Sequence, residues 1–175
     1  LEFRPSTEYQ LSVEGDENAI IPLDESNLIT KSYRLLKSKI KRVPSEYAVH
    51  LKKKIPLGSG LGGGSSNAAA TLKALNELWN VNLSLNKLER LGSELGADVP
   101  FFIRGGVQLI EGIGDRLTVQ DSTPLNGLYF LLVISPIHIS TPWAYETLNK
   151  TLRPDKSRSK FAPLSKPMNW ELFEN

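Results

Sequence analysis

A glycine-rich stretch at residues 58–66 constrains this sequence more than any other feature. It reads Gly-Ser-Gly-Leu-Gly-Gly-Gly-Ser-Ser, and glycines, which lack a Cβ atom, let consecutive backbone N–H groups approach an oxyanion closely. Ser65 and Ser66 can cap a following helix or donate hydroxyl hydrogen bonds to a phosphate or its Mg²⁺. The stretch therefore predicts a phosphate-binding loop, and a merely flexible loop is the alternative.

The segments on either side of this stretch differ in periodicity. Before it, apolar residues alternate from Tyr47 to Leu51, which predicts a half-buried strand that continues through three lysines and ends at Pro56. After it, residues 67–79 predict a helix whose apolar face consists of Ala68, Ala69, Leu72, Leu75 and Trp79. The predicted order of strand, glycine loop and helix is typical of nucleotide-phosphate sites.

Periodicity predicts further elements in a mixed order. Helices are expected at 27–41, with Asp24 or Ser26 as N-cap, at 84–95 before the stop signal Gly96, and at 141–148. Strands are expected at 1–3, at 101–103, in a hairpin of 107–111 with 117–119, and as a buried strand at 128–135. This mixture predicts an α+β fold. A change in character at 122–124 predicts two domains, 1–122 and 123–175, each incomplete, so a fragment is expected.

The composition excludes several classes of protein and of site. Hydrophobic residues make up 40% and charged residues 23% of the chain, which argues against a disordered or membrane-spanning protein. The absence of cysteine excludes disulfides, thiolate metal sites and a thiol nucleophile, and two histidines, His50 and His138, are too few for a histidine-rich metal centre. Any chemistry must use carboxylates, hydroxyls, lysines or backbone amides.

Positive charge is concentrated in one part of the chain. The whole chain has a net charge of +2, but residues 31–54 contain nine basic residues and one acid, a net of +8. Such a run can attract a polyanion, such as a nucleotide triphosphate. The alternative is a solvated helix face followed by an exposed strand. Both interpretations remain open from the sequence.

Three known nucleotide motifs compete for the glycine stretch. The pattern Gly-x-Gly-x-x-Gly of dinucleotide sites is present at 58–63, but the preceding strand ends in three lysines, and Glu77, the acid nearest the expected spacing, lies within the predicted helix. The P-loop pattern would need a lysine where Gly64 stands. The catalytic-loop and metal-binding signatures of protein kinases do not follow downstream.

The stretch from Pro56 to Ala69 instead resembles the phosphate loop of the GHMP small-molecule kinases. Within them it is most similar to the branch that acts on a cytidine-diphosphate-linked methylerythritol. Three further stretches support this resemblance, in the same order as in the family: Leu95–Phe102 (Leu-Gly-Ala-Asp-Val-Pro-Phe-Phe), Glu111–Leu117 (Glu-Gly-Ile-Gly-Asp-Arg-Leu) and Ser140–Tyr145 (Ser-Thr-Pro-Trp-Ala-Tyr).

The resemblance implies a fold and a reaction. The fold would have an N-terminal ATP-binding domain like domain 2 of ribosomal protein S5 and a C-terminal ferredoxin-like domain, truncated here. The reaction would be ATP-dependent, Mg²⁺-assisted phosphorylation of a hydroxyl of 4-diphosphocytidyl-2-C-methyl-D-erythritol, giving the 2-phosphate and ADP, in the non-mevalonate route to isoprenoid precursors. A monomer or weak homodimer in the bacterial cytoplasm or plastid stroma is expected, without nucleic-acid or membrane partners.

The resemblance also assigns roles to residues. Asp98 matches the catalytic aspartate, which would accept or orient the proton of the attacking hydroxyl, and Asp98, Thr141 and Tyr145 match the substrate side, where an aromatic ring stacks on cytosine. ATP would be bound by the loop and by two positions near the nucleoside: Gly58, Ser59, Gly60, Leu61, Gly62, Gly63, Gly64, Ser65, Ser66, Lys53 and Asn27. The metal ligands remain unassigned.

Simpler roles and other functions remain open beside these. Asp98 can be a turn former, Lys53 a solvated strand-end lysine and Tyr145 a core aromatic. Ser59 stands where the family commonly has glycine, and the family's N-terminal lysine, its Gly-Tyr-His segment and its C-terminal glycine motif have no match in this sequence. The alternative functions are another GHMP kinase acting on a sugar or mevalonate-like alcohol, and a nucleotide-binding module without transfer activity.

Overall fold

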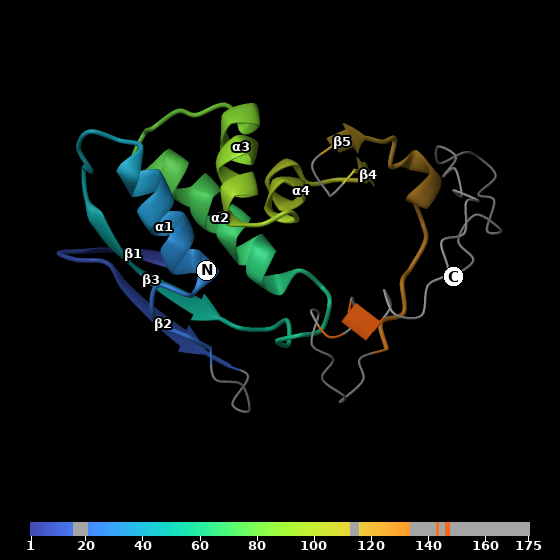
Figure 1. Cartoon of the computed structure of the whole chain (residues 1–175), viewed down its shortest axis with the longest axis horizontal. Coiled ribbons are helices and arrows are strands. Elements are labelled where there is room, and N and C mark those ends of the chain that lie inside the picture. Colours follow the sequence, from blue (N-terminus) through green and yellow to red (C-terminus); the bar gives the residue numbers. More distant parts are fainter. Residues whose placement is uncertain (16–20, 113–115, 134–142, 144–145, 148–175) are drawn as a thin grey trace. The chain divides into compact units, whose positions relative to one another are not determined.

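A computed structural model describes residues 1–15, 21–112, 116–133, 143 and 146–147 (Figure 1). The chain divides into two compact units, one of Leu1–Gly105 with Ile110–Leu117 and the other of Gly106–Leu109 with Thr118–Asn175. In the described part of the chain, no helix has both the length and the apolar composition that crossing a membrane requires.

The first unit contains a three-stranded sheet with β3 (Glu46–Lys52) at its centre. Strand β1 (Glu2–Ser6) pairs with β3 antiparallel, and β2 (Gln10–Glu14) pairs with it parallel. The register places Phe3 and Leu11 on either side of Val49, and these side chains join the core. A strand before the glycine loop is confirmed, but it ends at Lys52 and does not continue to Pro56 as predicted; the strand expected at 1–3 lies mainly within β1.

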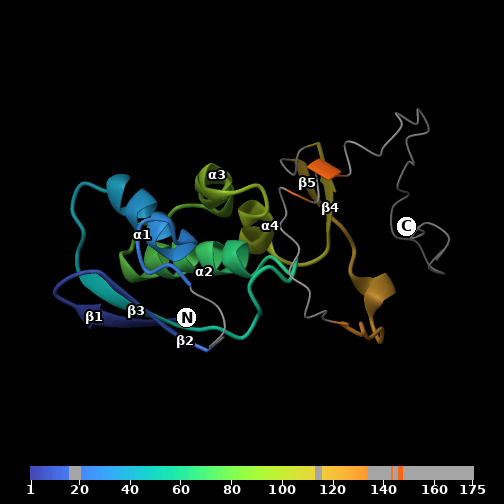
Figure 2. The same ribbon diagram turned by 60° about the horizontal axis from the view of Figure 1, so that its bottom comes forward.

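Helices cover one face of this sheet (Figures 1 and 2). Helix α1 (Leu28–Ser38) packs against α2 (Gly63–Leu78), and α3 (Leu85–Leu95) and α4 (Val99–Arg104) pack against α2. Tyr33 is fully buried between them; its ring meets Trp79 edge to face, and its hydroxyl donates to Glu46. The core is apolar and continuous, and comprises Ile29, Tyr33, Leu36, Tyr47, Val49, Leu51, Ala68, Ala69, Leu72, Leu75, Trp79, Leu88, Leu91, Val99 and Ile103.

The bounds of two helices differ from the sequence-based expectation. Asn27, and neither Asp24 nor Ser26, caps α1, because its side-chain oxygen accepts a hydrogen bond from the Ile29 N–H. Helix α2 begins at Gly63, four residues before the predicted start, so the last part of the glycine stretch is its first turn. The helix expected at 84–95 is confirmed, with Ser84 at the N-cap position and Gly96 at the C-cap.

The strand predicted at 101–103 is wrong, because these residues lie in α4. Aromatic and β-branched residues favour strands, but Pro100 lies in the first turn of α4, where its fixed φ angle favours a helix. Val99 and Ile103, one turn apart, are both buried beside Gly92 of α3. Tertiary packing on α3 therefore outweighs local strand propensity, and Asp98 comes to lie at a helix N-terminus.

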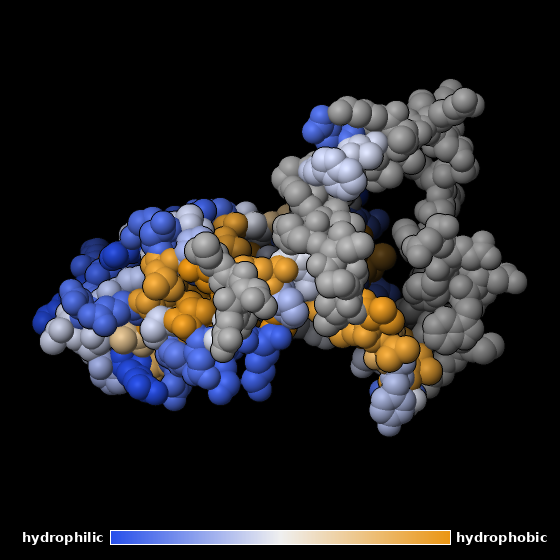
Figure 3. Space-filling view, turned by 90° about the horizontal axis from the view of Figure 1, so that it is seen from below, coloured by the Kyte–Doolittle hydropathy of each residue, from blue (hydrophilic) through white to orange (hydrophobic). Residues whose placement is uncertain are grey.

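The hairpin of β4 (Gln108–Glu111) and β5 (Arg116–Val119) is confirmed, and a short 3₁₀ turn follows at Thr123–Leu125. The buried strand predicted at 128–135 is wrong for residues 128–133, which are exposed and belong to none of the described strands. Figure 3 shows hydrophobic residues, in orange, at the surface of the face that it presents. Of the helix predicted at 141–148, only Trp143, Glu146 and Thr147 are described, and they are helical.

Candidate phosphate and nucleoside site

The glycine loop adopts a backbone that favours glycine at alternate positions. Gly58, Gly60 and Gly62 have φ angles of 68°, 72° and 65°, in the left-handed region. Gly62 is the N-cap of α2, and its carbonyl accepts a hydrogen bond from the Ser66 N–H at 2.8 Å. The first N–H groups of a helix have no partner within it and carry the positive end of its dipole. The loop and this helix end therefore form a backbone site suited to phosphate oxygens.

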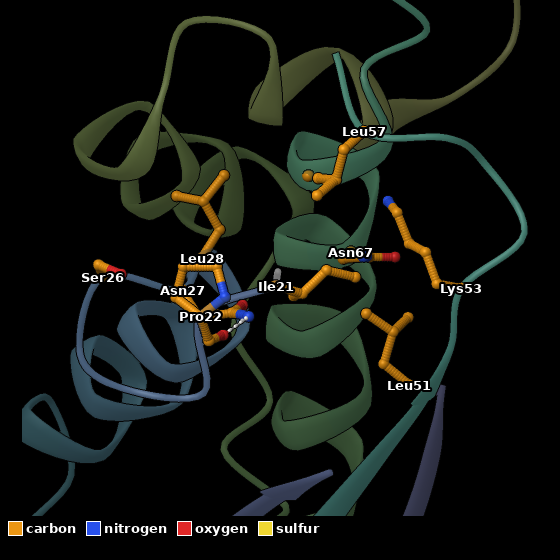
Figure 4. A pocket seen from close by; sticks show the side chains of 10 residues that line it. Ile21, Pro22, Ser26, Asn27, Leu28, Leu51, Lys53, Leu57 and Asn67 are labelled. Carbon is orange, nitrogen blue, oxygen red and sulfur yellow. Dashed lines mark hydrogen bonds between the residues drawn. The ribbon is translucent and has the colours of Figure 1, made fainter. Parts of the chain in front are cut away.

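Lys53 brings a positive charge to the same place. A Cβ atom added to Gly63 would lie 2.9 Å from the Lys53 Nζ and 3.1 Å from the Ile55 Cγ2, so the ammonium group reaches the first turn of α2. Figure 4 shows the Lys53 side chain extending from the end of β3 toward α2, beside Asn67. A lysine ammonium near exposed helix N–H groups adds a point charge to an anion site.

A cavity of about 150 Å³ lies next to the loop (Figure 4). It brings together Asn27, Lys53 and Gly64, three residues that the sequence assigns to ATP. The Asn27 side chain is held in place, since it accepts from the Ile29 N–H and donates to the Pro22 carbonyl at 2.6 Å. The walls are mostly apolar with a few polar groups, as in many small-molecule sites, and comprise Ile21, Pro22, Ser26, Asn27, Leu28, Leu51, Lys53, Leu57, Gly64 and Asn67.

Asn67 is a site residue that sequence reasoning missed. It lines this cavity and a second one of about 130 Å³, and Leu51 and Lys53 also line both cavities. Asn67 follows Gly63 and Gly64 by four and three residues, so the three lie on one side of α2. That helical spacing could have identified Asn67, but only if the helix had been expected to begin at Gly63.

Asp98 is the N-cap of α4, and this helix contacts the glycine loop. The Asp98 carboxylate is exposed and makes no capping hydrogen bond to α4. Phe102, one turn further on, contacts the loop: a Cβ atom on Gly62 would lie 2.6 Å from the Phe102 Cζ. Residues four apart share a helix face, and Asp98 has helical backbone angles, so Asp98 lies on the face of α4 that meets the loop.

The far end of α4 is fixed to α3. The Arg104 guanidinium donates to both carboxylate oxygens of Glu89, at 2.5 and 2.6 Å, and to the Asn86 side chain at 2.9 Å. The hydrogen bond with Glu89 raises the pKa of Arg104, although burial opposes this shift. Planar, bidentate pairs of this kind restrict orientation as well as distance. Asp98 thus precedes a helix that is held by Phe102 within it and by Arg104 at its C-terminal end.

The basic run does not form a uniform positive surface, because Glu46 within the run and three acids from outside it pair with four of its members. Lys37 pairs with Glu46, and the pairs Arg34 with Glu25 and Lys52 with Glu14 each lie at 3.3 Å. Lys39 lies 3.7 Å from Glu94. Lys53, a member of the same run, lines the cavity beside the loop. Three acids from outside the run, Glu14, Glu25 and Glu94, offset part of its net charge of +8, and Lys53 places a positive charge at the site.

The described residues show no group of three or more histidine or acidic side chains that could hold a metal ion. Thr141 and Tyr145, expected on the substrate side, lie outside the described residues. The structure thus brings Asn27, Lys53 and the loop together around one cavity and places Asp98 on the helix beside the loop.

Comparison with known proteins agrees with this arrangement. Residues 27–106 match the family model described as the GHMP kinases N-terminal domain. The chain is 42% identical over 147 residues to a 4-diphosphocytidyl-2-C-methyl-D-erythritol kinase of Synechococcus sp. (strain CC9605), covering 83% of this chain and 47% of the relative. It is 39% identical over 170 residues to the protein of the same name in Hahella chejuensis (strain KCTC 2396), covering 93% and 55%. The chain thus spans about half the length of the curated relatives it matches.

Solved structures show the same relationship at the level of the fold. A crystal structure of 4-(cytidine 5'-diphospho)-2C-methyl-D-erythritol kinase superposes with a TM-score of 0.61 and 28% identity, covering 87% of this chain and 50% of that one. A homoserine kinase from Cytophaga hutchinsonii superposes with a TM-score of 0.56 and 25% identity, covering 67% and 41%. The predicted α+β fold and the predicted resemblance are confirmed.

Proposed function

Because this chain belongs to the GHMP kinases, we propose that it binds ATP at the glycine loop and serves phosphoryl transfer to a hydroxyl of 4-diphosphocytidyl-2-C-methyl-D-erythritol. The observation that carries the proposal is the convergence of three groups on one helix end: the left-handed glycines, the Lys53 ammonium and the helix that bears Asp98. Phosphoryl transfer depends mostly on positioning and charge neutralisation, and these groups supply both.

In the proposed complex, the nucleoside occupies the cavity beside the loop. Its apolar walls, including Ile21, Leu51 and Leu57, suit the faces of a planar base, and Asn27 and Asn67 supply polar groups. The cavity shares Gly64 and Lys53 with the phosphate site, so a nucleotide can extend from the cavity to the N-terminus of α2. This continuity supports a mononucleotide with a polyphosphate tail.

Asp98 is proposed as the group that accepts the proton of the substrate hydroxyl. The hydroxyl oxygen forms a bond to the γ-phosphorus, the bond from that phosphorus to the β-phosphate oxygen breaks, and ADP leaves. The exposed carboxylate of Asp98 has no capping bond to hold it, so it is available to the hydroxyl. Mg²⁺ would neutralise charge on the phosphates, which supply most of its ligands in such sites.

The proposal also covers the cytidine side of the substrate site, the second domain, the oligomeric state and the cellular location. Thr141 and Tyr145 would hold the cytidine, and residues 123–175 would begin a second, substrate-side domain after the domain at 1–122. A monomer or weak homodimer in the bacterial cytoplasm or plastid stroma is part of the same proposal.

Mutating Tyr145 to Ala would remove the stacking surface, and the substrate KM should then rise roughly tenfold without a change in ATP affinity.

A radioactive transfer assay tests the proposal. The chain, and a longer protein that contains it, are incubated with γ-labelled ATP, Mg²⁺ and the cytidine-linked methylerythritol, and the labelled product is quantified. Homoserine and mevalonate serve as competing acceptors, because the homoserine kinase shares the fold. Transfer to either acceptor but not to the cytidine compound would replace the proposed substrate. Thermal stabilisation by NAD but not by ATP would reject the kinase assignment in favour of a dinucleotide-binding module.

A further inference from the structure

Three consecutive lysines follow one another at the end of the central strand, whose last residue is Lys52, and the ammonium group of Lys53 lies against Gly63 in the first turn of α2. Side chains alternate between the two faces of a strand. Lys52 lies on the outer face, where its Nζ is 3.3 Å from the Glu14 carboxylate. Lys53 lies on the inner face, where its Nζ would be 2.9 Å from a Cβ atom on Gly63. If β3 shifted by one residue in register, Lys52 would face inward and Lys53 would face outward.

The end of β2 holds the Lys53 backbone on both sides. The Lys53 N–H donates to the Glu14 carbonyl at 2.7 Å, which extends the parallel pairing of β2 and β3 by one bond. The Lys53 carbonyl lies against Gly15, where an added Cβ atom would be only 2.5 Å from the carbonyl oxygen. No side chain fits at this distance without a backbone shift, and Gly15 also has a φ angle of 91°.

We propose that Gly15 is a positioning residue for Lys53: its missing side chain lets the strand end approach closely enough to aim the Lys53 ammonium at the phosphate site. This inference rests on the proposed nucleotide function of Lys53. It assigns a role to Gly15, which lies outside the glycine loop and lines neither cavity, but which contacts the backbone of the cavity residue Lys53.

A side chain at Gly15 would displace the Lys53 peptide. The contact is with backbone, which cannot rotate away as a flexible side chain can, so the Lys53 peptide must move. Charge-assisted hydrogen bonds depend on distance and angle, and a displacement of about 1 Å at the anchoring peptide is enough to weaken them. ATP affinity should fall because Lys53 is displaced and not because the loop changes.

The test is a double-mutant cycle on ATP affinity, measured by calorimetry on the full chain. Gly15→Ala and Lys53→Met should each weaken ATP binding roughly tenfold, the scale of one charge-assisted hydrogen bond. The double variant should bind ATP no more weakly than Lys53→Met alone, because the glycine acts through the lysine. Lys87→Met, which removes an exposed lysine of α3, should bind ATP like the unmodified chain.

Gly106→Ala is the matched control. Gly106 has a similar left-handed φ angle of 74°, but a Cβ atom there meets nothing within 4 Å, so the variant carries the strain without the collision. If Gly15→Ala does not fold, Gly15→Asn replaces it, because asparagine tolerates left-handed angles but still places a Cβ atom against Lys53.

The outcomes separate this inference from the proposed function. Equal ATP affinity of Gly15→Ala and Gly106→Ala would overturn the positioning role, and so would losses that add in the double variant. If Lys53→Met binds ATP as tightly as the unmodified chain, the nucleotide role of Lys53 itself fails. Loss of ATP binding in Gly15→Ala, with none in Gly106→Ala and no further loss in the double variant, would support the inference.

Discussion

The ring of Phe102 lies directly against Gly62, the left-handed residue that begins α2. An added Cβ atom on Gly62 would be 2.6 Å from the Phe102 Cζ and 2.7 Å from its Cε2. The phosphate loop and the helix that bears Asp98 therefore meet through one glycine and one aromatic ring. Changes at either residue should affect both parts of the site.

Replacing Gly62 by Ala should destabilise the chain by about 2 kcal/mol, through backbone strain at a positive φ angle and through collision with the ring. Chemical unfolding measures this change. Phe102→Leu in the same background should recover part of the lost stability, because the shorter side chain makes room for the new methyl group. If the double variant is less stable than the sum of the single changes predicts, the contact between these residues is misassigned.

Replacing Gly63 by Val should lower ATP affinity roughly tenfold or more, since the branched side chain occupies the space of the Lys53 Nζ and the Ile55 side chain. Calorimetry with ATP gives the affinity, and circular dichroism checks that the fold persists. Ala70→Val is the control, because Ala70 is exposed in the same helix and the change introduces the same β-branched side chain away from the loop. Equal ATP affinity of the two variants would rule out close approach of phosphate at Gly63.

Replacing Asp98 by Asn should reduce kcat by about 100-fold or more, the usual effect of removing a general base, with little change in ATP affinity. The side chain keeps its size but loses its negative charge and its ability to accept the proton. Single-turnover assays with saturating ATP and acceptor measure the chemical step. Glu94→Gln, an exposed acid on α3, is the control. Unchanged transfer in Asp98→Asn would make Asp98 a turn residue.

The free energy of unfolding should decrease at acid pH because the Glu46 carboxylate becomes protonated. Burial alone raises the pKa of this carboxyl, but hydrogen bonds from Lys37 and Tyr33 and the nearby positive charges of Lys37 and Arg34 outweigh burial and lower it. A lowered pKa in the folded state means that the carboxylate stabilises the fold above its ordinary pKa of 4.5, and that this contribution is lost as the pH falls through the lower folded value.

Urea unfolding between pH 7 and pH 3 tests this linkage. Glu46→Gln should be less stable than the unmodified chain at pH 7, and the difference should shrink as the pH falls below 4.5. Glu2→Gln, which changes an exposed acid that pairs with Arg4, is the control. A difference that does not depend on pH would assign the effect of Glu46 to packing.

The order of strand, glycine loop and helix around residues 46–78 is predictable because local rules agree there. Tyr47, Val49 and Leu51 alternate, glycines follow, and apolar residues then repeat at helical spacing. The start of α2 is harder to predict, because glycines have poor helix propensity and yet Gly63 and Gly64 are helical. Gly62 supplies the left-handed turn that lets the helix begin among glycines.

Three other features depend on contacts between distant residues. The segment Phe101–Ile103 has strand-forming residues, but Pro100 in the first turn favours a helix and the packing of Val99 and Ile103 on Gly92 stabilises it. The convergence of Asn27 and Lys53 on the loop follows from the resemblance to a family, and not from any local pattern. Pairing of the basic run with Glu14 and Glu94 likewise needs the tertiary fold, since both acids lie outside the run.

The sheet order has a consequence for synthesis of the chain. Strands β1 and β2 both pair with β3, which follows α1, and they do not pair with each other. On a ribosome, β1 and β2, which lie within residues 1–45, would therefore emerge before β3, the strand that pairs with both of them. Neither β1 nor β2 can complete its backbone hydrogen bonds until Glu46–Lys52 has left the exit tunnel, so a translational pause placed before that strand would prolong exposure of two unpaired edges.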